Sequence, residues 1–139
     1  MAWFRPLLVM VSTLSLTVGC AKEDPSPCVE FVQPSDCLPE YEPTFQNIYE
    51  RTILQRCAIG GGSCHLASGA RGGLVLEGLE TAHEALVAQG LVVAADPECS
   101  VLIDRLERVG QPGLMPPGSP LTEAERCAVT QWVRAGANR

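Results

Sequence analysis

The sequence has little positive charge. It carries 10 Lys and Arg residues against 16 Asp and Glu residues, and its formal net charge is −6 at pH 7. Nucleic-acid-binding proteins need a basic surface that contacts phosphates, so this balance argues against a nucleic-acid partner. The acidic charge is compatible with plain solubility or with a basic partner protein.

The sequence also lacks an apolar run long enough to cross a membrane. The run over residues 7–18 has about a dozen residues, whereas a spanning helix needs about 20. Arg5 precedes this run, which is the pattern of a cleaved signal peptide over 1–19. Gly19-Cys20 resembles a bacterial lipobox, and this resemblance implies that Cys20 becomes the lipidated N-terminus of a cell-envelope protein. The alternative is ordinary secretion with Cys20 lost or left free.

Aromatic residues are scarce, at 5% of the chain. Within residues 42–139 only Phe45, Tyr49 and Trp132 are aromatic. A domain of this size buries its surface inefficiently and often needs disulfides or a cofactor to complete its core. The sequence therefore predicts that something braces or fills the interior.

Recognisable enzyme motifs are missing too. The chain contains no Ser-His-Asp order, no histidine pair and no phosphate-binding loop, and its glycine run does not follow a strand. We therefore expect neither an enzyme nor a small-molecule substrate.

Seven cysteines are present, at positions 20, 28, 37, 57, 64, 99 and 127. If Cys20 carries lipid, six remain, and thiols in an oxidising compartment pair or bind something. Six cysteines allow 15 pairings, so counting does not determine connectivity. Local spacing favours three pairs, Cys28–Cys37, Cys57–Cys64 and Cys99–Cys127.

Residues 20–41 are expected to be a lipid-anchored tether. Residues 21–41 contain four prolines and no helical period. A small Cys28–Cys37 loop would pin this tether, and a wholly disordered linker is the alternative. We expect the folded domain to cover residues 42–139.

That domain shows helical signals and no strand pattern. Apolar periodicity predicts helices within 42–57, 80–90, 96–110 and 121–137. Two capping boxes are expected, Thr81 with Glu84 and Thr122 with Glu125. Residues 72–78 should be extended, and residues 111–120 should form a proline-stiffened loop. The predicted class is all-α, with about four helices and long loops.

The stretch "RCAIGGGSCHLASGARGGL", residues 56–74, combines two cysteines with a histidine. A histidine directly after a cysteine pair is typical of c-type haem attachment, in which two residues separate the cysteines. Here six residues separate Cys57 from Cys64, and His65 follows. The mature sequence contains one methionine, Met115, which precedes two prolines.

These motifs follow a recognisable order. Cys-His, "GGLVL", "CSVLIDRL", "LMPPGSPLTEAE" and "WVRAGA" resemble the small cytochrome c-like domains of bacterial secreted and lipid-anchored proteins, over about residues 44–137. The resemblance implies a cytochrome c-like fold, a single haem c, electron transfer, and a redox partner protein in the periplasm. It also implies that the first and last helices cross, with Phe45 or Tyr49 near Trp132.

Carried over residue by residue, the resemblance implies four haem-binding residues. Cys57 and Cys64 would form thioethers, His65 would be the proximal iron ligand, and Met115 would be the distal ligand. Pro116 and Pro117 would stiffen the loop that presents the methionine. His83 is expected to face solvent and not to bind iron.

The six-residue spacing leaves alternatives open. The glycines at 60–62 make an outward bulge sterically possible, which would keep the haem geometry. A Cys57–Cys64 disulfide is geometrically undemanding, and it would make the chain a haem-free, disulfide-braced structural or interaction lipoprotein. A third possibility is a zinc or copper site formed by Cys57, Cys64, His65 and a further cysteine.

Overall fold

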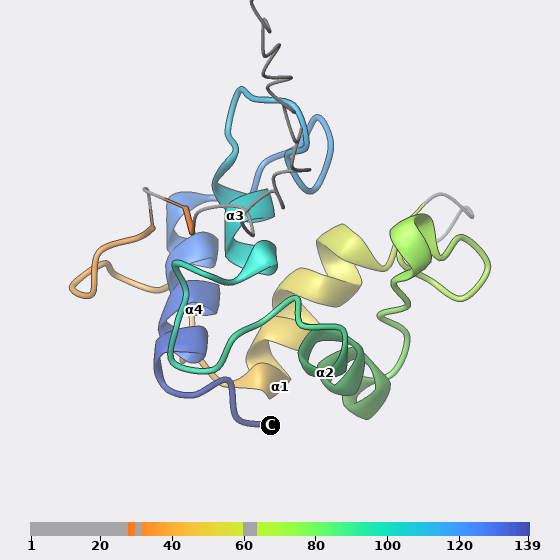
Figure 1. The fold of residues 1–139 in the computed structure, drawn as a ribbon, viewed down its shortest axis with the longest axis horizontal. Helices are drawn as coiled ribbons and strands as arrows, with labels where there is room; N and C mark the ends of the chain where they lie inside the picture. Colours follow the sequence, from red (N-terminus) through yellow and green to blue (C-terminus); the bar gives the residue numbers. More distant parts are fainter. Residues whose placement is uncertain (1–27, 30–31, 60–63) are drawn as a thin grey trace, which may run out of the picture.

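The computed structural model describes residues 28–29, 32–59 and 64–139. Over those ranges the chain forms helices and loops without a strand, which confirms the all-α class (Figure 1). The elements are α1 (Phe45–Ile48), η1 (Tyr49–Cys57), η2 (Arg71–Gly73), α2 (Leu79–Ala88), α3 (Val101–Glu107) and α4 (Glu123–Arg134). The predicted signal peptide over 1–19, the predicted lipidation site Cys20 and the glycines at 60–62 lie outside the described residues.

The first helix is continuous from α1 into η1, which is a π-helix. Thr44 caps it by accepting a hydrogen bond from the backbone N–H of Asn47. Its buried side chains recur at helical spacing, as the periodicity predicts, and they are Phe45, Ile48, Tyr49, Thr52 and Ile53. This face packs toward the centre of the domain.

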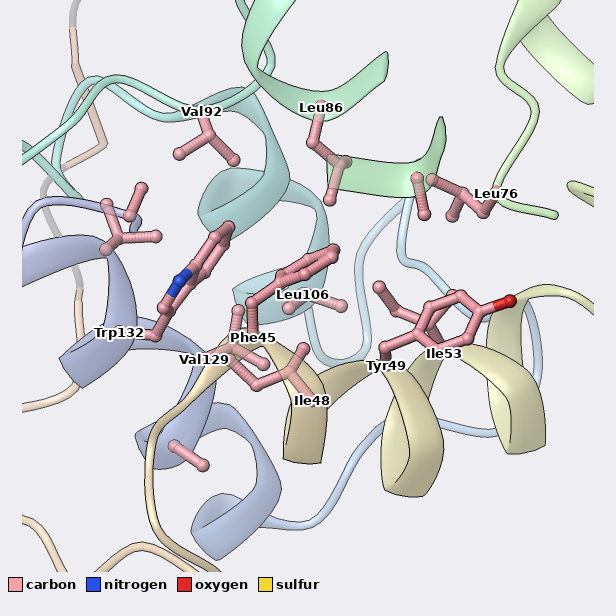
Figure 2. Packing of buried hydrophobic residues seen from close by; sticks show 14 of the residues in the cluster. Phe45, Ile48, Tyr49, Ile53, Leu76, Leu86, Val92, Leu106, Val129 and Trp132 are labelled. Atoms are coloured by element: carbon pink, nitrogen blue, oxygen red, sulfur yellow. The ribbon is translucent and has the colours of Figure 1, made fainter. Parts of the chain in front are cut away.

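The first and last helices meet in the core. The rings of Phe45 and Trp132 lie 5.1 Å apart between centroids, and the two side chains are 1% and 2% exposed (Figure 2). The predicted contact between these helices is therefore confirmed, with Phe45 as the partner of Trp132. Val92, Leu106 and Val129 pack around the same centre.

One of the two predicted capping boxes is confirmed. Thr122 caps α4 reciprocally with Glu125, through backbone-to-side-chain distances of 3.1 and 2.7 Å. The box predicted at Thr81 and Glu84 is wrong, because α2 begins at Leu79 with Gly78 at its N-cap and Thr81 lies inside the helix. Gly78 has φ 88°, a conformation that favours glycine.

The third helix is shorter than its sequence pattern indicates. α3 begins at Val101 rather than near Pro97 and ends at Glu107 rather than at Gly110. Upstream, Asp96 accepts hydrogen bonds from the backbone of Cys99 and, at its carbonyl, from the hydroxyl of Ser100. These side-chain bonds stabilise a turn in place of the expected first helical turn.

The disulfide pairing inferred from local spacing is wrong. The structure links Cys28 to Cys99 and Cys37 to Cys127, across sequence separations of 71 and 90 residues. Neither Cys28–Cys37 nor Cys99–Cys127 forms. All four of these cysteines are paired, as expected, but each pair connects the N-terminal segment to the helical domain instead of closing a local loop.

The described residues upstream of 42 are part of the domain. The backbone N–H of Val29 donates to Glu98, and the side-chain amide of Gln131 donates to the carbonyl of Cys37, both at 2.8 Å. Gln33 and Tyr41 are buried, at 2% and 8% exposure. The expected boundary at residue 42 thus divides residues that the structure packs together.

Among the described residues, no helix combines the length and the apolar character needed to cross a membrane.

Candidate functional site

A half-open cavity of about 730 Å³ lies beside the end of the first helix. This volume falls within the roughly 300–1,000 Å³ of typical cofactor pockets. Its walls come from the C-terminal end of η1, from η2, α2 and α3, and from the loop before α4. The four residues singled out as haem-binding all line it: Cys57, Cys64, His65 and Met115.

Most of the remaining wall is apolar. The aliphatic lining residues are Leu74, Leu76, Leu86, Leu91, Val101, Leu102 and Leu106. The side of α3 that carries Val101, Leu102 and Leu106 therefore faces this cavity. Val101 is 42% exposed, because it borders the cavity rather than filling the core.

His65 is held with one ring nitrogen available. Its Nδ1 lies 3.3 Å from the carbonyl oxygen of Leu74, and a carbonyl only accepts, so Nδ1 carries the proton. In the neutral form of the ring, this bond leaves Nε2 as the nitrogen with a free lone pair, the form that binds metal ions. Metal-binding histidines are commonly oriented by such a bond from the other nitrogen. Backbone bonds to Cys57 and Leu76, at 3.1 and 2.6 Å, fix the position of the residue.

Met115 lies in the loop that joins α3 to α4. Its backbone N–H donates to the carbonyl of Arg105 at 2.9 Å, which ties the loop to α3. Pro116 and Pro117 also line the cavity, and the Met115–Pro116 peptide bond is cis. The two prolines have fixed φ angles, and together with the bond to Arg105 they restrict the loop that carries the methionine.

Cys57 and Cys64 are free thiols in this structure, and no disulfide joins them. Burial, together with the neighbouring Cys64, raises the pKa of the Cys57 thiol to about 12. Cys57 is consequently a protonated thiol at neutral pH.

Three arginines also line the cavity, and the sequence patterns predicted none of them as a site residue. Arg56, Arg71 and Arg105 come from η1, η2 and α3. Arg56 lies 3.5 Å from Glu125, and its Nε is buried without a hydrogen-bond partner.

His83 lies apart from the cavity, and the expectation that it faces solvent is wrong. The residue is half-buried, its ring centroid lies 4.9 Å from that of Phe45, and its Nε2 lies 2.8 Å from the carbonyl oxygen of Ala137. His83 thus belongs to the aromatic core around Trp132, 6.1 Å away between centroids.

Among the described residues, no further free cysteine is left to complete a zinc or copper site at Cys57, Cys64 and His65. The four other cysteines that the structure describes are consumed in disulfides. In the same part of the chain, no group of three or more His, Cys, Asp or Glu side chains is arranged to hold a metal ion. Three-ligand cysteine and histidine sites need a fourth ligand from elsewhere.

Alkylation of the protein without haem should label Cys57 and Cys64 and no other described cysteine. Cys64 should react first at pH 8, because the thiolate is the reactive form and burial keeps Cys57 protonated. Mass spectrometry of timed iodoacetamide reactions measures both rates. Labelling of Cys28, Cys37, Cys99 or Cys127 before denaturation would contradict the disulfide assignment.

Comparisons of the chain with protein-family models, with curated proteins and with solved structures gave no match. The resemblance to cytochrome c-like domains therefore rests on the ordered sequence motifs. The function proposed below rests on those motifs together with the cavity.

Proposed function

We propose that the chain is a cytochrome c-like, monohaem electron-transfer domain. One observation carries this proposal: residues chosen from the sequence as haem-binding, from two segments about 50 positions apart, line a single cavity. Cys57 and Cys64 would hold haem c through thioethers, and His65 and Met115 would bind its iron. Iron with a His/Met ligand pair supplies one-electron transfer at a raised potential.

The chemistry of the cavity fits this group. Haem is a large apolar ring with two carboxylates at one edge. The leucines of the wall would cover the ring and exclude water from it, while the unpartnered Nε of Arg56 offers a hydrogen-bond donor to a carboxylate. The Nδ1 bond to Leu74 keeps the Nε2 of His65 ready to bind iron. The loop prolines hold Met115 in place.

The proposed cellular location rests on the predicted signal peptide and the predicted lipidation of Cys20. A signal peptide over 1–19 and lipid on Cys20 would anchor the domain to a membrane of the bacterial envelope, facing the periplasm or the exterior. The partner would be a redox protein in that compartment. Neither a nucleic acid nor a small-molecule substrate belongs to this function.

A haem-free, disulfide-braced structural or interaction lipoprotein is the second candidate. The observation that favours it is the pair of long-range disulfides, Cys28–Cys99 and Cys37–Cys127, which brace the helices without any cofactor. On this alternative the cavity would be a remnant of an ancestral haem site.

The visible spectrum separates these candidates. Protein expressed with the haem-attachment machinery should show a Soret band that survives denaturation and extraction, since thioether bonds are covalent. A protein without a Soret band, in which Cys57 is linked to Cys64, would contradict the electron-transfer function and favour the braced lipoprotein.

Replacing Met115 with alanine should remove the weak sulfur-to-iron absorption band and leave the haem attached. The reason is that Met115 would contribute one axial ligand but no covalent bond to the ring. Leu114→Ala is the matched control, because Leu114 is its neighbour in the loop and does not line the cavity. An unchanged band in Met115→Ala would exclude the methionine as ligand.

A further inference from the structure

The charged side chains that line the cavity are all positive, although the protein as a whole is acidic. The described residues include eight arginines, and three of them line the cavity: Arg56, Arg71 and Arg105. The same residues include thirteen aspartates and glutamates, and none of those lines it. The cavity is therefore a local region of positive charge on a chain whose formal net charge is −6.

Two of these arginines have no ion-pair partner among the described residues. Arg56, Arg108, Arg126 and Arg139 each lie within 4 Å of a carboxylate, whereas Arg71 and Arg105 do not. The guanidinium of Arg105 makes one long hydrogen bond, of 3.5 Å, to the carbonyl of Gly113, and no other among the described residues. Both side chains are exposed while lining the cavity, so they lie at its mouth.

The two arginines approach the mouth from different elements. Arg71 belongs to η2 and Arg105 to α3, which flank the C-terminal end of the first helix in Figure 1. The partly exposed side chain of Val101 lies on the same wall. An apolar opening flanked by unpaired cations is the kind of surface that transient protein partners use, with apolar contact at the centre and charge at the rim.

We infer that the mouth of this cavity, with Arg71 and Arg105, is the docking face for an acidic partner protein. The inference rests on the proposed function for one point only, namely that this partner is a redox protein. Overall charge alone favours a basic partner, but a partner is guided by the potential where it docks. Negative charge elsewhere on the chain would repel an acidic partner from the wrong faces and steer it to the mouth.

An acidic protein fits this face better than an anionic membrane does. Recognition of anionic lipid typically uses a cluster of four to eight lysines and arginines. The mouth offers two unpaired arginines, and the chain as a whole is acidic. Redox encounters bury little surface, commonly below about 1,200 Å², so a few well-placed charges are enough to orient them.

The test measures binding of the purified protein to fluorescein-labelled poly-L-glutamate by anisotropy, in about 10 mM salt, where screening is weak. We expect the double variant Arg71→Glu/Arg105→Glu to raise the Kd at least about tenfold, because two attractions become repulsions. Adding salt to about 1 M should weaken binding by the unaltered protein.

The matched control is Arg51→Glu/Arg139→Glu, which makes the same change in net charge at two exposed arginines that do not line the cavity. In the same low-salt buffer, its Kd should rise clearly less than that of the mouth variant, because these two side chains act on the bound polyglutamate only from a distance. Melting curves and the Soret band are recorded on the same samples. A missing Soret band would contradict the proposed haem. The change in Kd caused by the mouth substitutions tests the docking face independently of that result.

Three results would overturn the inference. The control variant could weaken binding as much as the mouth variant does, which would assign binding to overall charge. The protein could bind vesicles of phosphatidylcholine and phosphatidylglycerol through the mouth arginines and ignore polyglutamate, which would assign the face to a membrane. Polyglutamate could also fail to bind at all.

Discussion

Replacing His65 with alanine should abolish stable haem incorporation and remove the Soret band. His65 is the residue whose Nε2 is left available in the cavity by the Nδ1 bond to Leu74. Without it, the iron would lose its proximal ligand, and the alanine would leave a space where the ring had support. The measurement is the ratio of Soret to protein absorbance in purified protein made with the haem-attachment machinery.

The other histidine gives the matched control for this experiment. His83 packs on Phe45 and Trp132 and does not line the cavity, so His83→Ala should lower the melting temperature and keep the Soret band. Far-ultraviolet circular dichroism shows whether each variant has folded. A folded His65→Ala protein with a full Soret band would rule out His65 as the proximal ligand.

Loss of the Cys37–Cys127 disulfide should strongly lower the free energy of unfolding. In the chain-entropy model, closing a loop of this length stabilises the native state by about 4–5 kcal/mol. That is a large share of the roughly 5–15 kcal/mol that stabilises a small domain. Cys37→Ala should therefore lower the melting temperature by roughly 20 °C or more.

Double variants show which cysteines are paired. Cys37→Ala/Cys127→Ala should melt about as low as Cys37→Ala, because the first substitution has already broken the bond. Cys28→Ala/Cys37→Ala should melt lower than either single variant, because it breaks two different bonds. The opposite pattern would support the Cys28–Cys37 loop that local spacing favoured. Calorimetry of all variants under identical conditions provides the comparison.

Local sequence patterns predicted the helices well where the signal was local. The buried face of the first helix from Phe45 to Ile53 follows directly from apolar periodicity. The box of Thr122 and Glu125 also formed, because its two bonds join residues three positions apart. The predicted start of α3 was too early. Asp96 accepts a local hydrogen bond from Cys99 that stabilises a turn where the first helical turn was expected.

Local sequence patterns could not predict which cysteines form disulfides. Short spacing favours pairs between cysteines that are neighbours along the chain. In the structure, the described residues between 28 and 41 lie against the helices instead. Hydrogen bonds from Val29 to Glu98 and from Gln131 to Cys37 hold these residues there. The thiols that meet are therefore 71 and 90 positions apart, and sequence distance carries no information about such contacts.

By itself, the sequence determined the helical class of this protein and the identities of its candidate ligands, Cys57, Cys64, His65 and Met115, because these depend on periodicity and on rare residue types in order. Only the tertiary structure decided that these side chains share one cavity and that the four other described cysteines pair over long distances. It alone also decided that Arg71 and Arg105 lie at the mouth of the cavity, with no carboxylate partner among the described residues. The physical reason is that cavities, disulfides and surface potentials are made by residues close in space, whereas sequence patterns report only residues close along the chain.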